Sequence, residues 1–228
     1  PLTHTIAEAY LLQKTAAETK VATQMGNQGH CFDGVRDLCE MVWAGAIGDV
    51  KEVHIWTNRP IWPQGIADPL TKEPIPETMD WDLWIRTAPM RDYNKGYAPF
   101  NWRGWWDFGC GAIGDMACHI VDPAFFSLKL KEAKTFTVEV VEQEGITKQC
   151  APNKSKIKFT FPAHAGMPPV VIYWYDGKGN LPKWPEGVPA GEKIGDGENG
   201  SLFIGTKGMM TSGCYGEESR LLPGEKMK

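Results

Sequence analysis

An aspartate and a histidine are spaced so that they could perform acid–base chemistry together. Asp115 and His119 are four residues apart in the segment DMACHIVD, which has a helical composition. Residues at this spacing project from one face of a helix, where a carboxylate can orient an imidazole and fix its tautomer. Such a pair suits a general base that removes a proton from a hydroxyl group. A helix-capping aspartate beside a half-buried histidine would give the same pattern.

Other polar side chains are candidates for ligand contacts. The segment TQMGNQGH places Asn27, Gln28 and His30 at a predicted turn between a strand and a helix, where ligands collect in open α/β sheets. Amides donate and accept hydrogen bonds, so they suit hydroxyl-rich ligands, although ordinary turn chemistry explains them equally well. Arg103 follows Trp102 and could hold a carboxylate or sugar oxygen, or stack on neighbouring indoles.

Metal and phosphate sites have weaker support. Asp122 lies one turn beyond His119, but no further ligands occur at metal spacing, so we predict no metal centre. Two segments match the spacing G-x-G-x-x-G, beginning at Gly109 and Gly195. Neither lies between a predicted strand and a helix, and acidic residues within or beside each would repel phosphate. We therefore expect no dinucleotide phosphate loop here.

Composition excludes several classes of function. The chain has 228 residues, a net charge of −4 and dispersed basic residues, which argues against binding nucleic acid. No apolar run approaches the roughly 20 residues that span a bilayer, so we expect no membrane partner. The six cysteines form no C-x-x-C pair. Of ten tryptophans, seven fall between Trp56 and Trp106, which indicates a rigid loop core or a sugar-stacking surface.

The predicted elements change in character along the chain. Helical patterns and one strand come first, then a long Pro- and Trp-rich loop, and then a run of strands with turns between them. This order predicts an α+β fold with a large, mostly antiparallel, open-faced sheet and helices on one face. The predicted helices are 6–19 with a Thr5–Glu8 capping box, 30–44, a short one near 80–85, and 115–128 with a break at Pro123. The predicted strands are 21–25, 49–58, 135–142, 156–161, 170–175, 201–204 and 209–211, with an exposed loop over 177–200.

The chain resembles the Gfo/Idh/MocA oxidoreductases, a family that includes glucose–fructose oxidoreductase and inositol dehydrogenase. The resemblance is carried by PLTHTIAEA, TQMGNQGH, GDVKEVHIWTNRP, WRGWWDFGCGAIGDMACHIVD and FIGTKGMM. The Asp-x-x-x-His pair formed by Asp115 and His119 is a specific marker of the family.

The resemblance implies a division of the chain. Family members have an N-terminal Rossmann domain for NAD(P) and a C-terminal α/β domain whose open sheet commonly forms the oligomer interface. Residues 1–25 would then be the last helix and strand of the Rossmann domain. Residues 26–228 would be the substrate-binding and oligomerisation domain, incomplete at its C-terminus. Pro1 matches the proline of a Glu-Lys-Pro motif, whose lysine would directly precede it.

The resemblance also implies roles for individual residues. His119 would accept the proton of the substrate hydroxyl while hydride passes to nicotinamide C4, and Asp115 would orient the substrate or the histidine. The expected substrate contacts are Asn27, Gln28, His30, Trp102 and Arg103, and the expected cofactor contacts are Pro1, Gln24 and Met25.

We therefore predict a fragment of an NAD(P)-dependent oxidoreductase that acts on a sugar or polyol and is inactive by itself. Its open sheet face is expected to be apolar and to form a homo-oligomer. Two alternatives remain: a glycosidase of the same fold that uses bound NAD, and a non-catalytic carbohydrate-binding or oligomerisation module. Substrate identity, the choice between NAD and NADP, and a cytoplasmic or periplasmic location stay open.

Overall fold

The computed structural model describes residue 3 and residues 5–227. Within these residues lies one seven-stranded sheet with the order β2-β3-β4-β1-β5-β6-β7. Only β1 and β4 are parallel neighbours in this described sheet, and all other adjacent pairs are antiparallel. The predicted mostly antiparallel sheet is therefore confirmed. The strands are β1 (Val50–Trp56), β2 (Thr137–Glu144), β3 (Lys154–Phe161), β4 (Val170–Asp176), β5 (Gly200–Gly205), β6 (Met209–Ser212) and β7 (Arg220–Leu222).

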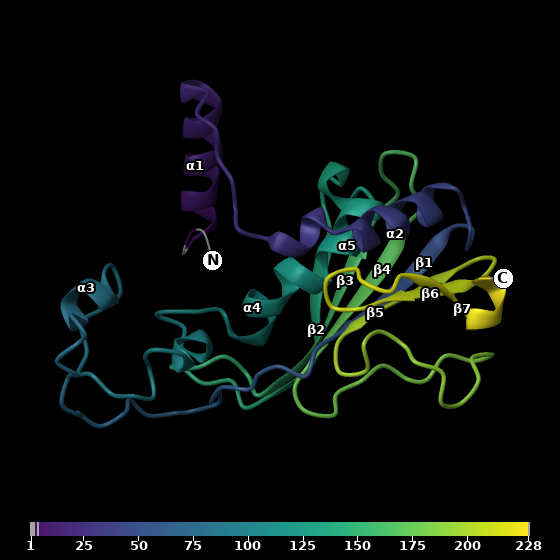
Figure 1. The fold of residues 1–228 in the computed structure, drawn as a ribbon. Helices are drawn as coiled ribbons and strands as arrows, with labels where there is room; N and C mark the ends of the chain where they lie inside the picture. The colour runs from purple at the N-terminus through teal and green to yellow at the C-terminus, as the bar shows by residue number, and fades with distance from the viewer. Residues whose placement is uncertain (1–2, 4, 228) are drawn as a thin grey trace.

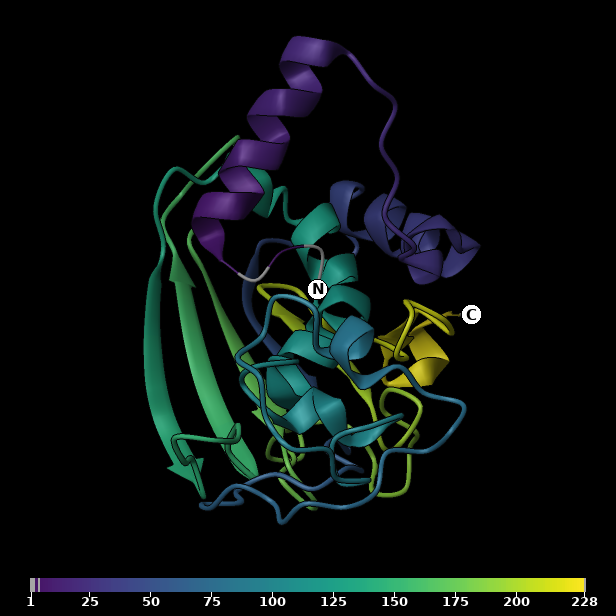
Figure 2. The ribbon, with the colours of Figure 1, turned by 90° about the vertical axis from the view of Figure 1, so that its left-hand side faces the viewer.

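Helices cover one face of the sheet, as predicted (Figures 1 and 2). They are α2 (Asp33–Trp43), α4 (Gly111–Ile120) and α5 (Asp122–Ser127). Alternate residues of a strand point to opposite faces, so β1 sends Val53 and Ile55 toward these helices. Both meet Leu38 of α2, Ile120 of α4 and Trp174 of β4 in the main core, and all five are at most 1% exposed.

The predicted helix over 115–128 is two helices in the structure. α4 ends at Ile120, and α5 begins at Asp122 with Pro123 in its first turn, so the break expected at the proline is confirmed. Proline is tolerated there because the first turn of a helix has no internal acceptor for its backbone N–H groups. α4 starts earlier than predicted, at Gly111, whose φ of +66° turns the chain into the helix.

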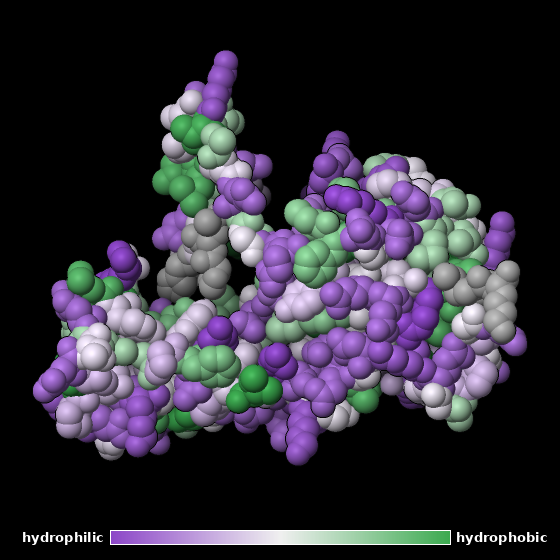
Figure 3. Space-filling model, in the orientation of Figure 1, coloured by the Kyte–Doolittle hydropathy of each residue, from purple (hydrophilic) through white to green (hydrophobic). Residues whose placement is uncertain are grey.

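The N-terminal helix α1 (Ile6–Thr19) stands away from the body of the molecule (Figure 3). Its predicted capping box is present, because the Thr5 hydroxyl accepts from the Glu8 N–H and the Glu8 carboxylate accepts from the Thr5 N–H. None of its described residues is buried, and Ile6 and Leu11 are more than half exposed. The strand predicted over 21–25 does not form, since the described residues offer it no hydrogen-bonded neighbour.

The loop over 59–103 has its own aromatic core. It contains the short helix α3 (Trp81–Ile85), which Asp80 caps through the Leu83 N–H, as expected for a helix near 80–85. Trp81, Tyr97 and Trp105 pack together, and Trp105 is fully buried with its indole N–H on the Gly96 carbonyl. For these tryptophans the loop-packing interpretation is correct.

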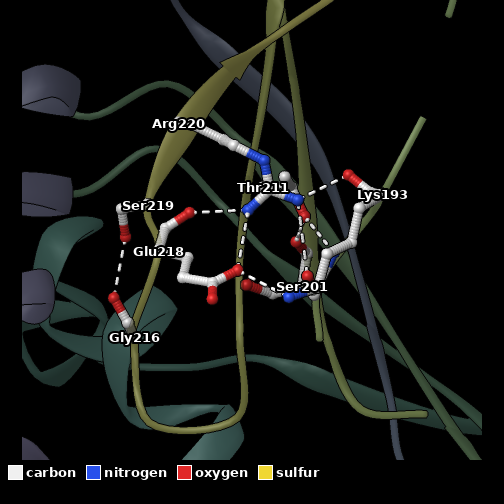
Figure 4. A network of polar contacts seen from close by, with 8 residues as sticks. Lys193, Ser201, Thr211, Gly216, Glu218, Ser219 and Arg220 are labelled. Atoms are coloured by element: carbon white, nitrogen blue, oxygen red, sulfur yellow. Dashed lines mark hydrogen bonds and ion pairs between the residues drawn. The ribbon is translucent and has the colours of Figure 1, made fainter. Parts of the chain in front are cut away.

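The long loop over 177–199 is attached to the last strands by a polar network (Figure 4). Arg220 of β7 donates to the Lys193 carbonyl, and the Lys193 ammonium pairs with Glu218 at 2.8 Å. Thr211 of β6 donates to the Ser201 carbonyl of β5 at 2.7 Å. The strand β7 was not predicted from the sequence, because three residues with one arginine carry too short a pattern.

The outer face of the sheet, opposite the helices, is not apolar where it is uncovered. On β2 and β3 it carries Glu139 paired with Lys158 at 3.2 Å and Glu142 paired with Lys154 at 2.9 Å. The prediction of an apolar face is wrong for these strands. β2 is an exposed edge strand, and charged cross-strand pairs are a common way to protect such an edge. No helix formed by the described residues is long and apolar enough to cross a bilayer.

Candidate functional site

A cavity of about 380 Å³ lies between the segment after α1 and the start of α4. We call it the Asp115 cavity. Its walls come from residues far apart in the sequence, which is why the fold is needed to form it. They are Gln24, Met25, Gly26, Trp102, Arg103, Cys110, Gly111, Gly114, Asp115 and Cys118. Gln24 and Met25, predicted as cofactor contacts, and Trp102 and Arg103, predicted as substrate contacts, are therefore brought together with Asp115.

His119 is held one turn further along α4 by Asn27. The Asn27 Nδ2 donates to the Cys118 carbonyl at 2.6 Å, so its Oδ1 is the atom that faces the His119 Nδ1 at 3.0 Å. An amide oxygen only accepts hydrogen bonds, so the Nδ1 of a neutral His119 must carry the hydrogen. The Nε2 then has a free lone pair. Asn27 therefore fixes the tautomer in which Nε2 can accept a proton.

Tyr215 fixes the other side of the His119 ring. The two rings meet edge to face, with centroids 5.1 Å apart. Tyr215 also lies against Gly29, where a Cβ atom would come within 2.8 Å of the tyrosine ring. Burial raises the pKa of the Tyr215 hydroxyl, with a smaller effect of nearby Cys214, so the phenol stays protonated. Sequence reasoning missed Tyr215, because the turn GCYGE that carries it has no catalytic signature.

Asp115 is held by Arg103 rather than by His119. The Arg103 Nε donates to the Asp115 Oδ1 at 3.0 Å, and its Nη1 donates to the Phe100 carbonyl at 3.0 Å. The guanidinium also lies over the rings of Phe100 and Trp102, 4.5 and 4.6 Å from their centroids. The stacking interpretation of Arg103 is therefore confirmed, and the carboxylate that it binds is that of Asp115 in the same chain.

This arrangement changes the part expected of Asp115. Its side chain makes no hydrogen bond or ion pair with His119 among the described residues, and the role of orienting the imidazole belongs to Asn27. The glycine-rich segment before α4 explains the pairing with Arg103. A Cβ on Gly109 would lie 2.6 Å from the Arg103 carbonyl oxygen, so only glycine lets the two segments approach this closely.

Two predicted substrate contacts lie elsewhere. Gln28 is exposed and its side chain has no hydrogen bond among the described residues. His30 pairs with Asp122 at 2.8 Å and lines a separate cavity of about 500 Å³ with Trp43 and Phe126, between α2 and α5. His30 lies within the 3₁₀ helix η1 (Gln28–Cys31), and Asn27 lies just before it, so Asn27 reaches α4 whereas His30 reaches α5. Pro1, a predicted cofactor contact, lies outside the described residues.

Cys118 does not supply a reactive thiolate to the Asp115 cavity. Burial raises the pKa of its thiol, and the Asp115 carboxylate raises it further. The thiol therefore stays protonated at neutral pH. Among the described residues, no group of three or more His, Cys, Asp and Glu side chains could hold a metal ion.

Comparisons with known proteins identify the fold and the family. Among solved structures, the chain is similar to super-repressor mutants of Gal80p from Saccharomyces cerevisiae. One has 17% identity and a TM-score of 0.52, covering 92% of this chain and 45% of that one. An oxidoreductase from Sinorhizobium meliloti has 16% identity and a TM-score of 0.47, covering 97% and 48%. The chain spans about half the length of these proteins, and no curated protein matches it.

The match to a family profile is more specific. The profile for the C-terminal alpha/beta domain of an oxidoreductase family covers residues 40–168, more than half of the chain, and it includes the strand β1, the tryptophan-rich loop and the Asp115–His119 helix. The chain therefore belongs to the Gfo/Idh/MocA oxidoreductase family, of which it contains the C-terminal α/β domain.

Proposed function

We propose that this chain is the substrate-side domain of an NAD(P)-dependent oxidoreductase that acts on a hydroxyl group of a sugar or polyol. His119 would accept the hydroxyl proton, and Asp115 would bind a second hydroxyl of the substrate. The observation that carries the proposal is the hydrogen bond between Asn27 Oδ1 and His119 Nδ1, which leaves the Nε2 lone pair free for a proton.

The described residues do not fit the diphosphate of a dinucleotide. The glycine that begins α4 already packs against the protein itself, since a Cβ on Gly111 would lie 2.4 Å from the Ala151 Cβ. The carboxylate of Asp115 faces the same cavity and would repel phosphate. In our proposal residues outside this chain hold most of the cofactor, which supplies a hydride acceptor when bound.

In the proposal, His119 accepts the proton and Asp115 binds a substrate hydroxyl. When His119 takes a proton on Nε2, its Nδ1–H continues to donate to Asn27, so the imidazolium keeps its orientation. Arg103 occupies Oδ1 of Asp115, and Oδ2 has no partner among the described residues. Oδ2 can therefore accept a hydrogen bond from a substrate hydroxyl. His119 does not line the Asp115 cavity but lies one turn from Asp115 on α4, so a substrate with adjacent hydroxyls would have to reach both acceptors.

The test is the substitution His119→Asn in the full-length protein, assayed with NAD⁺ and NADP⁺ against a panel of sugars and polyols. Asparagine keeps a polar side chain but cannot take the proton. We expect kcat to fall by about 10²–10⁴-fold, the usual contribution of a general base. Formation of the reduced nicotinamide is the readout. The control is His164→Asn in the turn between β3 and β4, far from α4 in the sequence, which should keep normal turnover.

Two outcomes would replace the proposal. If full-length His119→Asn kept normal turnover, catalysis would not depend on His119. This chain would then be better explained as a non-catalytic carbohydrate-binding module of the full-length protein. A second assay tests the glycosidase alternative with nitrophenyl glycosides, with and without added nicotinamide cofactor. Release of nitrophenol without net formation of reduced cofactor would identify a glycosidase that uses bound NAD.

A further inference from the structure

We infer that the substrate is a glycoside with at least two sugar units, and that Trp84 and Trp102 bind the second unit in a cavity next to the Asp115 cavity. The inference rests on the proposed function for the first unit. The second cavity, which we call the Trp84 cavity, has a volume of about 460 Å³. It is lined by Thr3 of the N-terminal segment, by Trp102, and by residues 84–88 and 107–110, which come from α3 with the turn after it and from the turn before α4.

The two cavities adjoin. Trp102 and Cys110 line both the Asp115 cavity and the Trp84 cavity. Each cavity alone falls within the size range of small-molecule sites. A ligand with one ring beside Asp115 and another beside Trp84 would thus contact the lining that the two cavities share, Trp102 and Cys110. This continuity makes the Trp84 cavity an extension of the Asp115 cavity.

The hydrogen bonding of the indole N–H groups also points to the Trp84 cavity. Eight of the ten tryptophans donate their N–H to an oxygen of the described chain; they are Trp43, Trp56, Trp62, Trp81, Trp105, Trp106, Trp174 and Trp184. Trp84 and Trp102 are the two whose N–H has no acceptor among the described residues. Both are half-buried, and both line the Trp84 cavity. Two tryptophans whose N–H groups have no acceptor among the described residues therefore line one cavity.

The walls of this cavity suit a sugar ring. Trp84 is held rigidly, stacked on Trp81 with centroids 4.9 Å apart and an angle of 12°, and in edge contact with Phe108 at 4.9 Å. Rigid indoles present a flat apolar surface at little entropic cost, and their N–H groups can donate to hydroxyl oxygens. Arg86 adds an exposed guanidinium that forms no ion pair among the described residues.

Charge argues against a strongly anionic second unit. Asp107 lines the same cavity, and its carboxylate pairs with Arg91. The cavity thus holds one paired acid and one free cation, without the cluster of cations that a phosphate or sulfate group would require. Aromatic rings combined with a few mixed polar groups are the lining expected for an uncharged, hydroxyl-rich ring.

The experiment compares a sugar with its glycosides in the full-length protein. Binding is measured by isothermal titration calorimetry, and turnover by reduced nicotinamide, for glucose, methyl glucoside, cellobiose and maltose, with galactose and lactose as a second series. In at least one series we expect the disaccharide to bind about tenfold or more tightly than its monosaccharide. Trp84→Ala should abolish that preference and leave monosaccharide binding unchanged.

Two further variants keep the result interpretable. Trp84→Phe retains a ring that can stack on Trp81 but lacks the N–H, so it should lose part of the preference even if Trp84→Ala unfolds the loop. Trp106→Ala removes a tryptophan whose N–H is bonded to the Thr147 carbonyl and which lines neither cavity, and it should behave as wild type.

The outcomes separate the two proposals. If the monosaccharide is oxidised and the disaccharide gains nothing, or gains the same in Trp84→Phe, the second subsite is wrong and the catalytic proposal stands. If disaccharides bind in a Trp84-dependent way without turnover, the subsite stands and the oxidoreductase proposal fails. If none of these sugars binds, both are overturned.

Discussion

The amide of Asn27 makes two hydrogen bonds that act together on His119. One, to the Cys118 carbonyl, sets which end of the amide is the donor, and the other then sets which ring nitrogen carries hydrogen. Neither bond stabilises the fold much, because a typical net contribution is about 1 kcal/mol. Their effect is on the population of the reactive tautomer, so Asn27 is a positioning residue.

Replacing Asn27 should therefore damage turnover more than folding. For Asn27→Ala in the full-length protein we expect kcat to fall by about 10–100-fold, as for other residues that orient a catalytic side chain. The loss should lie in kcat, because the imidazole loses the acceptor that orients it. A change in KM alone, with kcat intact, would contradict the role. Asp37→Ala, an exposed change on α2 outside the site, is the control.

A second residue-scale feature concerns stability. Asp176 is 2% exposed, and its Oδ2 accepts hydrogen bonds from the Ser155 hydroxyl at 2.8 Å and the Trp174 indole at 2.7 Å. Its Oδ1 has no partner among the described residues. Burial raises the pKa of this carboxyl above its ordinary value of 3.8, and the two hydrogen bonds only partly oppose that shift.

The direction of the pH effect follows from this shift. Because the folded state holds the Asp176 proton more tightly than the unfolded state, its contribution to stability is full below the ordinary pKa and is lost as pH rises through the folded value. Asp176→Asn should remove this loss, so its free energy of unfolding should fall less between about pH 4 and about pH 7 than that of wild type. Urea titrations at both pH values measure the difference. A steeper fall in the variant would show that the charged form is favoured.

At the scale of elements, local signals predicted local structure. The Thr5–Glu8 box and the break at Pro123 each act within one helical turn, and both lie where the sequence placed them. The short helix expected near 80–85 also forms, and the structure shows that Asp80 caps it. Two predictions about strands were wrong for a different reason: a strand was expected over 21–25 and does not form, and β7 forms but was not expected. A strand exists only with a hydrogen-bonded partner, and its partner is remote in sequence.

The turn before α4 offers a test of how one element is positioned. Gly111→Ala would place a Cβ in the left-handed region, which costs about 1–2 kcal/mol, and would also press on Ala151. We expect a fall in Tm of several degrees, since each kcal/mol shifts Tm by about 2–4 °C in a chain of this size. Differential scanning calorimetry gives the measurement.

Two further variants separate the backbone strain of Gly111→Ala from its steric clash with Ala151. Gly166 has a φ of +79° and nothing within 4 Å of a built Cβ, so Gly166→Ala should show the backbone cost alone. Adding Ala151→Gly to Gly111→Ala should recover the part due to contact. Equal losses in Gly111→Ala and Gly166→Ala would mean that the turn does not depend on close packing.

At the scale of the whole molecule, the site exists because three distant segments meet. The sequence identified Asp115, His119, Arg103 and Asn27 as candidates, yet paired Asp115 with His119 because they are one turn apart. Asn27 lies 92 positions from His119, and Arg103 reaches Asp115 only because the glycine-rich turn folds back. Spacing along a helix shows which side chains share a face. It does not show which side chains from distant segments form hydrogen bonds with them.

The outer sheet face determines how two copies could associate. We propose that this face forms the homo-oligomer interface, and its composition makes that interface electrostatic. In the register of β2 and β3, a row of Glu139, Glu142 and Glu144 runs beside a row of Lys158, Lys156 and Lys154. In a two-fold contact the lysine row of one copy can meet the glutamate row of the other, since the same surface is used twice. Such an interface gains little from the hydrophobic effect.

Salt should therefore weaken the oligomer of the full-length protein. Ion pairs are screened over about 10 Å at 0.1 M salt and about 3 Å at 1 M, whereas apolar contacts are not weakened in this way. Sedimentation velocity at low and high NaCl should show dissociation as salt rises, and Lys156→Glu should favour the monomer even at low salt. Lys207→Glu, on an exposed turn between β5 and β6, changes the net charge equally and should leave the oligomer intact. An oligomer that resists both salt and Lys156→Glu must use another face, and a monomer under all conditions would remove the interface altogether.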